Sequence, residues 1–176
     1  MKYCPNCGNK VACRVPDGDS RMRCVCDDCG QVHYENPKIV VGCVPEHEGR
    51  ILLCKRAIEP RRGYWTVPAG FMELGESLAE GAARETREEA CAEVQMGHLF
   101  ASVDVIEAGQ VHFFFKARLI GGFDAGEETL EAALFRKEDI PWREIAFLSG
   151  TFALQKFVED AGEDNGVHMH RVPHGE

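Results

Sequence analysis

The pattern of apolar and polar positions divides the chain into two parts. Residues 1–33 show little apolar periodicity, whereas residues 39–44 form a β-branched run that is typical of a buried strand. Residues 50–55 return as the second strand of a hairpin after a glycine-containing turn. Asn36 precedes a proline, and this position disfavours helical backbone. We therefore predict a small domain over residues 1–34 and a larger one over residues 37–161.

The larger part mixes strand and helix patterns. We predict a short extended piece, then a helix rich in Ala, Glu and Arg, then three strands and an amphipathic helix, over residues 64–68, 77–91, 94–105, 110–120, 132–136 and 147–160. Phe113 and Phe115 share one face of their strand, and Phe114 lies on the other. Strands on both sides of the main helix predict an α/β sandwich. Residues 162–176, with two early glycines and three histidines, predict a mobile tail.

Composition and charge narrow the class of protein. Of 176 residues, 44% are hydrophobic and 28% are charged, as in soluble globular proteins. No apolar run approaches the roughly 20 residues that cross a bilayer, and no apolar signal-peptide core follows the N-terminus, so we expect a cytoplasmic protein. The net charge of -9 disfavours nucleic-acid binding through a broad basic surface. It is compatible with a small phosphorylated ligand held by local Arg and Lys.

Six of the nine cysteines lie in the N-terminal part, and four of them form two Cys-any-any-Cys-Gly motifs. These four are Cys4, Cys7, Cys26 and Cys29. Two such turns supply the four thiolates of a closed tetrahedral zinc site, which leaves no open position for water, so we predict a structural zinc ribbon. Cys13 and Cys24 could replace a ligand in a shifted pairing, but neither forms a pair followed by glycine. We interpret both as small packing residues, buried or partly exposed.

The helix over residues 77–91 carries an acidic face. Glu85, Glu88 and Glu89 are spaced i, i+3 and i+4, so their carboxylates share one side of the helix. Such a cluster repels itself unless a cation lies between the carboxylates, and oxygen ligands suit Mg²⁺ or Mn²⁺. Gly70 lets the preceding loop approach that cation or a phosphate closely. A solvated charged face is the alternative, and these three residues alone leave both interpretations open.

The complete spacing resembles the signature of the Nudix hydrolase family. Its charged and glycine positions are matched here by Gly70, Glu76, Arg84, Glu85, Glu88 and Glu89. Three positions depart from the signature, namely Thr86, Cys91 and Ala92. The resemblance covers residues 37–160. With the four-cysteine ribbon in front of this region, the chain is similar to a subgroup that includes NADH, FAD and ADP-ribose pyrophosphatases. It implies a Nudix α/β/α sandwich with a mixed β-sheet, preceded by the zinc ribbon.

The resemblance also implies residue roles. Glu85, Glu88 and Glu89 would hold the catalytic Mg²⁺ or Mn²⁺, with the Gly70 carbonyl as a further ligand. Arg84 would orient one of these glutamates through a bidentate pair. Glu76 would secure the junction between loop and helix or an outer ion. The general base would be a box glutamate or a glutamate of a later loop, where Glu127, Glu128 and Glu131 are candidates and Glu128 is our choice.

The sequence also suggests substrate contacts. Arg56 and Arg62 could meet phosphates, while Trp65 and Phe71 could stack on a ring, although Trp65 is equally suited to the core. NADH-specific relatives carry a Ser-Gln-Pro-Trp-Pro-Phe-Pro-any-Ser array after the box, and this chain lacks it. We therefore expect ADP-ribose, FAD or a similar ADP-linked diphosphate before NADH.

The predicted function is metal-dependent cleavage of a diphosphate bond in such a small-molecule nucleotide. The alternative is a non-catalytic Nudix-like nucleotide sensor whose ribbon contacts DNA or protein. The resemblance also makes a homodimer an expectation, because this family often dimerises. We expect no nucleic-acid substrate and no membrane segment.

Overall fold

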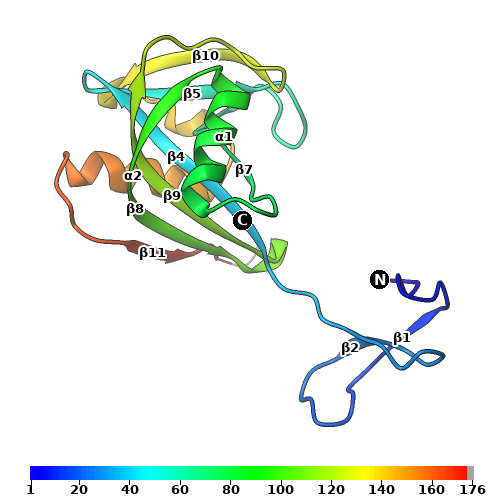
Figure 1. The fold of residues 1–176 in the computed structure, drawn as a ribbon. Helices are drawn as coiled ribbons and strands as arrows, with labels where there is room; N and C mark the ends of the chain where they lie inside the picture. Colours follow the sequence, from blue (N-terminus) through cyan, green and yellow to red (C-terminus); the bar gives the residue numbers. More distant parts are fainter. Residues whose placement is uncertain (174–176) are drawn as a thin grey trace. The chain divides into compact units, whose positions relative to one another are not determined.

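The computed structural model describes residues 1–173 and contains two compact units. The first unit is residues 1–36, and the second begins at Pro37 (Figure 1). Among residues 1–173, no helix has the length and apolar character that crossing a membrane requires. Each unit is described by itself below.

The N-terminal unit is a three-stranded antiparallel sheet with two cysteine-bearing turns. Its strands are β1 (Val11–Arg14), β2 (Arg23–Cys26) and β3 (Val32–His33), in that spatial order. Gly8 and Gly30 follow the two cysteine pairs and have φ angles of 77° and 71°. Their N–H groups donate to the carbonyls of Cys4 and Cys26 at 2.8 and 2.9 Å. Glycine is favoured at these positions because side chains rarely adopt that backbone conformation.

The second unit is built on one mixed sheet with the order β10-β5-β4-β9-β8-β11, and β6 and β7 pair with β5 and β4. These strands are β4 (Lys38–His47), β5 (Arg50–Arg56), β6 (Trp65–Thr66), β7 (Ala69–Phe71), β8 (Glu93–Val105), β9 (Gln110–Ile120), β10 (Thr129–Arg136) and β11 (His168–Arg171). The pairs β4–β9 and β8–β11 are parallel, and the other pairs are antiparallel. Three short 3₁₀ segments cover Ile106–Ala108, Lys137–Asp139 and Trp142–Glu144.

Two helices cover opposite faces of this sheet, which confirms the predicted α/β/α sandwich. Val41 of β4 packs in one cluster with Ala82 of helix α1 (Leu78–Ala90). Val44, on the other face of the same strand, packs in a second cluster with Leu154 of helix α2 (Leu148–Asp160). Because side chains alternate along a strand, two positions that are three apart lie on opposite faces. Figure 1 shows α1 and α2 on the two sides of β4.

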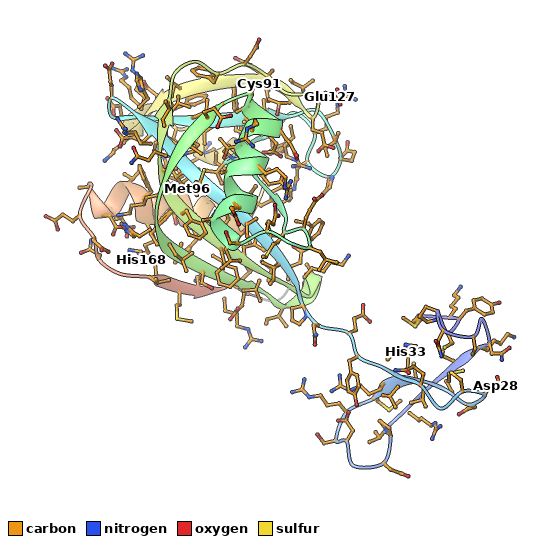
Figure 2. All side chains as sticks on the ribbon, viewed as in Figure 1. Asp28, His33, Cys91, Met96, Glu127 and His168 are labelled. Carbon is orange, nitrogen blue, oxygen red and sulfur yellow. The ribbon has the colours of Figure 1, made fainter. Side chains whose placement is uncertain are left out.

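Helix α1 is defined by local signals at both ends. Ser77 is its N-cap and forms a reciprocal capping box with Glu80. Cys91 ends the helix in a left-handed conformation, with φ 48° (Figure 2). The family signature has glycine at this position, and glycine favours that conformation. Thr86 replaces an apolar residue and is fully buried, but its hydroxyl donates to the carbonyl of Ala82 at 2.8 Å. Both departures from the signature are therefore accommodated without loss of the helix.

Part of the predicted mobile tail is instead ordered against the sheet. His168–Arg171 form β11, which runs parallel to residues 101–104 of β8. Asp160, at the end of α2, accepts hydrogen bonds from Asn165 and His168 at 2.9 Å each, and Lys116 lies 2.9 Å from its other oxygen. This buried carboxylate ties the segment after α2 to the sheet. Residues 168–171 of the segment that we predicted to be a mobile tail therefore form a strand, and residues 174–176 lie outside the described part of the chain.

Candidate functional site

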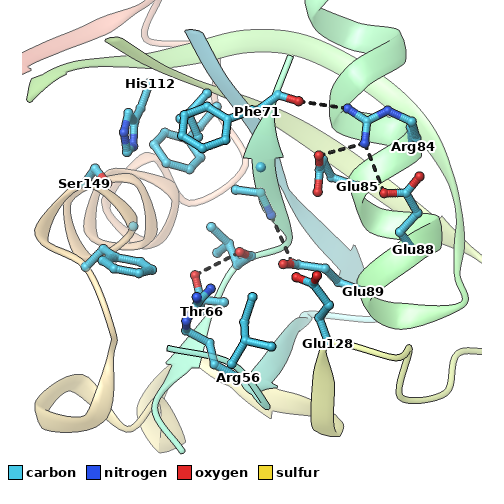
Figure 3. A pocket seen from close by; sticks show the side chains of 18 of the residues that line it. Arg56, Thr66, Phe71, Arg84, Glu85, Glu88, Glu89, His112, Glu128 and Ser149 are labelled. Carbon is cyan, nitrogen blue, oxygen red and sulfur yellow. Dashed lines mark hydrogen bonds and ion pairs between the residues drawn. The ribbon is translucent and has the colours of Figure 1, made fainter. Parts of the chain in front are cut away.

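A cleft of about 810 Å³ lies in the second unit, and it is the setting of the predicted acidic site. Its walls come from β7, α1, β9, the segment before β10 and the start of α2. Figure 3 shows Glu85, Glu88 and Glu89 projecting from α1 on one side, with His112 and Ser149 on the other. One side of the cleft is therefore acidic, whereas the other side carries a histidine and a serine.

Arg84 connects the loop before α1 to the acidic face of that helix. Its guanidinium donates two hydrogen bonds to Glu76, at 3.0 and 2.9 Å, and single bonds to Glu85 and Glu88 at 2.7 and 3.0 Å. It also donates to the carbonyl of Phe71 at 3.0 Å. The bidentate pair expected with a metal-binding glutamate is made with Glu76 instead. Arg84 thus holds the loop and the helix together while it orients two carboxylates.

The three glutamates differ in their environment. Glu89 is 8% exposed, and burial raises the pKa of its carboxyl to about 8. The N–H of Ala69 donates to it at 3.2 Å and opposes that rise in pKa. Burial also raises the pKa of Glu85, against the lowering effect of Arg84. Glu88 is more exposed, with 58% of its side chain accessible. Buried carboxyls with raised pKa values in a cleft are typical of functional sites.

The backbone of β7 lies directly against this acidic cluster. A Cβ atom added at Gly70 would collide with the carboxylate of Glu85, so a larger residue here would displace that carboxylate. The acidic cluster offers carboxylate oxygens as metal ligands. One of these carboxylates, that of Glu89, is buried beside β7. That donor set fits Mg²⁺ or Mn²⁺, and Glu85, Glu88, Glu89 and Gly70 are the residues that would hold the ion.

The loop before β10 brings the predicted base candidates to the cleft. The N–H of Gly126 donates to the carbonyl of Glu89 at 3.0 Å, and a Cβ atom at Gly126 would collide with the backbone of α1. Glu127 and Glu128 consequently line the cleft. Glu128 lies close enough to Glu89 to contribute to the rise in its pKa. Glu131 lies on β10, 3.9 Å from Lys55, and does not line the cleft.

Of the four residues predicted to contact the substrate, two line the cleft and two do not. Arg56 and Phe71 line the cleft, and Phe71 is 50% exposed. Arg62 does not line the cleft. Trp65 is 6% exposed and packs edge-on against Phe135 in the core, so the alternative interpretation of this tryptophan matches its position. It is buried because β6 pairs with β5 inside the sheet layer.

Sequence reasoning missed the polar residues on the far side of the cleft. His112 and Gln110 alternate on β9, and His112 Nε2 lies 2.8 Å from Gln110 Oε1. Burial lowers the pKa of His112 to about 4, so its ring is neutral at pH 7. Because the amide oxygen accepts, Nε2 carries the proton and Nδ1 is an acceptor. The alternating pattern of β9 was visible in the sequence, but nothing in it indicated that this face meets the cleft.

The start of α2 completes the far side. Helix α2 has no side-chain cap, and the N–H groups of residues 148–150 donate to no residue among positions 1–173. Ser149 is 3% exposed, lines the cleft, and its hydroxyl likewise has no hydrogen-bond partner in the described chain. Unpaired donors at a helix N-terminus favour an acceptor atom from a ligand.

The N-terminal unit carries its own candidate metal centre. One sulfur atom from each of Cys4, Cys7, Cys26 and Cys29 lies within 4.8 Å of the other three. Two of these Sγ–Sγ separations are 3.7 and 3.5 Å. Tetrahedral zinc with bonds of about 2.3 Å separates its sulfurs by about 3.8 Å. Four thiolates at this spacing fit a structural zinc ion.

Two protein-family models match the chain, one for each unit. A family model described as Nudix N-terminal, a zinc ribbon, matches residues 2–35, and the NUDIX domain model matches residues 36–152. A crystal structure of a NUDIX hydrolase from Nitrosomonas europaea is 45% identical, with a TM-score of 0.94, and covers 98% of this chain and 99% of that one.

Two curated relatives have named activities. The NAD-capped RNA hydrolase NudC of Vibrio atlanticus is 29% identical over 93% of this chain, which spans 58% of that relative's length. The ADP-ribose pyrophosphatase of Methanocaldococcus jannaschii is 33% identical over 61% of this chain and 67% of its own. With its acidic box and its four-cysteine ribbon, the chain belongs to the NUDIX domain family.

Proposed function

We propose that this protein is a metal-dependent hydrolase that cleaves the diphosphate bond of a nucleoside diphosphate linked to a second group. The observation that carries this proposal is the convergence of Glu85, Glu88 and Glu89 beside Gly70 at one end of a cleft large enough for such a substrate. Relatives named as an ADP-ribose pyrophosphatase and an NAD-capped RNA hydrolase support the reaction class.

The acidic end of the cleft would bind the diphosphate. A bound Mg²⁺ or Mn²⁺ would neutralise the phosphate oxygens and lower the pKa of a water molecule. Arg84 keeps two of the carboxylates in position through its hydrogen bonds. Arg56 lines the same cleft and reduces the pKa rise at Glu89, so its positive charge lies near the acidic end. Glu128 would accept the proton of the attacking water.

The far end of the cleft would bind a planar ring of the substrate. Phe71 offers an aromatic face, and the hydroxyl of Ser149 offers an unpaired donor next to the first N–H groups of α2. His112 is neutral there, which suits an uncharged ring better than a third phosphate. Ser149→Ala is therefore expected to raise KM, with little change in kcat. Thr151→Ala is the matched control, because that hydroxyl already donates to the carbonyl of Phe147 and Thr151 does not line the cleft.

The test is a substrate panel with the zinc-loaded protein and Mg²⁺ or Mn²⁺. ADP-ribose, FAD, NADH and NAD-capped RNA are each incubated, and the products are identified by chromatography. We expect a nucleoside monophosphate and a second phosphate monoester from ADP-ribose or FAD, and slower turnover of NADH. The alternative is a non-catalytic nucleotide sensor, and tight binding of one panel member without turnover of any would favour it.

Location and partners complete the proposal. We propose that the protein is cytoplasmic. We also propose that it acts on a small nucleotide and not on nucleic acid, because its net charge of -9 opposes binding of a nucleic acid. Turnover of the capped RNA above that of every small nucleotide would contradict this choice. A homodimer is also proposed from the family resemblance, and light scattering after size-exclusion chromatography measures the molar mass that decides it.

A further inference from the structure

Two cysteines of the N-terminal unit stand outside the four-thiolate site and face each other. Cys13 of β1 and Cys24 of β2 are directly opposite in the antiparallel register. Their Sγ atoms are 3.8 Å apart. Cys13 is exposed and Cys24 is half-buried.

The strand geometry already brings this pair close to bonding distance. Directly opposite residues of antiparallel strands have Cβ atoms about 4.5–5.5 Å apart and point to the same face. A disulfide requires Cβ atoms about 3.5–4.5 Å apart and sulfurs about 2.05 Å apart. Side-chain rotation and a small approach of β1 to β2 therefore suffice, with no change in register.

We propose that Cys13 and Cys24 form a reversible disulfide across the β1–β2 hairpin when the protein meets a low-molecular-weight disulfide such as oxidised glutathione. The exposed Cys13 thiolate attacks one sulfur of the reagent, which forms a mixed disulfide and releases one thiol. The thiolate of Cys24 then attacks the Cys13 sulfur and releases the second thiol. The two protein thiols lose two electrons to the reagent, and their two protons end on the released thiols.

The surroundings favour this pair over the other ribbon cysteines. The four thiolates of Cys4, Cys7, Cys26 and Cys29 converge on a shared site, and a bound zinc ion would shield their sulfurs from exchange. Cys13 and Cys24 share a face with Cys26 without belonging to that cluster. The new bond would close the hairpin beside a zinc ligand. We therefore expect the oxidised ribbon to release zinc more slowly than the reduced one.

A metal ion is the competing occupant of the same place. His33 of β3 is in register with Cys24, and its Nε2 atom is buried without a hydrogen-bond partner among residues 1–173 (Figure 2). However, Cys13, Cys24 and His33 do not bring their ligand atoms within 4.8 Å of one another, unlike the four cysteines. The positions of these atoms therefore favour a disulfide between the two sulfurs over a metal site formed by the three residues.

The experiment uses the full-length, zinc-loaded protein with oxidised glutathione. Intact mass spectrometry should show a loss of about 2 Da, and peptide mapping should assign the link to Cys13 and Cys24. Zinc content should stay at about one equivalent, and a reductant should restore the original mass. Cys91→Ser is the control, since that exposed cysteine lies in the other unit and its loss should leave the reaction unchanged.

Three results would overturn the proposal. One is a stable glutathione adduct on Cys13 that Cys24 does not displace. Another is a link that includes any of the four zinc-site cysteines. The third is a second equivalent of zinc that disappears in Cys13→Ser, which would assign the pair to metal binding. Because the wild-type chain is measured directly, a folding defect in a variant does not obscure the outcome.

Discussion

Replacing Glu89 by Gln should raise stability while it removes activity. Glu89 is 8% exposed, and burial raises the pKa of its carboxyl from 4.5 to about 8, with Glu85 and Glu128 adding to the rise. The unfolded chain therefore releases this proton at a lower pH than the folded chain does. The stability linked to Glu89 is fullest below pH 4.5 and is lost as the pH rises towards 8.

The size of this loss follows from the shift in pKa. Each pH unit between the two pKa values costs about 1.4 kcal/mol, so Glu89 lowers the free energy of unfolding by about 1 kcal/mol at pH 5.5 and by about 4 kcal/mol at pH 7.5. Gln is neutral in both states and keeps an oxygen that accepts from Ala69. Glu89→Gln should therefore gain about these amounts in the absence of Mg²⁺ and Mn²⁺.

The assay is urea unfolding of the zinc-loaded proteins at pH 5.5 and 7.5. Tryptophan fluorescence reports on the second unit, because Trp65 and Trp142 both lie there. Glu88→Gln is the matched control, since 58% of that side chain is exposed and its stability effect should stay below about 1 kcal/mol. With Mg²⁺ and substrate, Glu89→Gln should lose at least about 100-fold in kcat/KM.

Two results would refute this reasoning. An equal stability change at both pH values would show that the buried charge of Glu89 is not its source. Retained turnover would show that Glu89 does not hold the metal.

Three further predictions test other parts of the molecule. Gly70→Ala should lower kcat/KM at least about 10-fold, because the added methyl collides with Glu85, whereas Gly122→Ala, which meets no atom within 4 Å, should keep wild-type kinetics. Asp160→Asn should cost about 2 kcal/mol of unfolding free energy at pH 6. Burial alone would raise the pKa of Asp160, but its hydrogen bonds lower it to about 2, so in urea titrations this cost should shrink as the pH falls from about 4 to about 2. Cys26→Ser should lose zinc and leave residues 1–36 unprotected in hydrogen exchange, with an unchanged melting temperature for the second unit; retained zinc would contradict the four-thiolate site.

The regular elements were largely predictable because local patterns determine them. Helix α1 begins at its capping box and lies within one residue of the predicted range. Phe114 and Phe115 pack in different clusters, as their alternation on β9 predicted. By contrast, β11 has the sequence His-Met-His-Arg, which carries no apolar alternation. It is held by its parallel pairing with β8 and by the hydrogen bond from His168 to Asp160, and no local pattern reveals either.

The acidic side of the candidate site was predictable from a local pattern, whereas the far side was not. The three glutamates lie on one helix, so their spacing alone places them together. The far side of the cleft combines Ser149 and His112, from elements that only the sheet order brings near α1. Trp65 shows the converse limit, because an aromatic residue beside a basic loop has the same sequence signal in a core as in a binding site.

The parallel pairing at the centre of the sheet has a consequence for how the chain reaches its native state. Lys38 pairs with Gln110, and every later pair of β4 and β9 keeps the same separation of 72 positions. Closing such a loop costs about 3 kcal/mol more entropy than closing a short hairpin. Until β9 has been synthesised and has docked, the apolar strand β4 has only short strand pairings, with β5 and β7, and its packing against α1 covers one face. Nascent chains that stop before residue 110 should therefore be the most prone to aggregate.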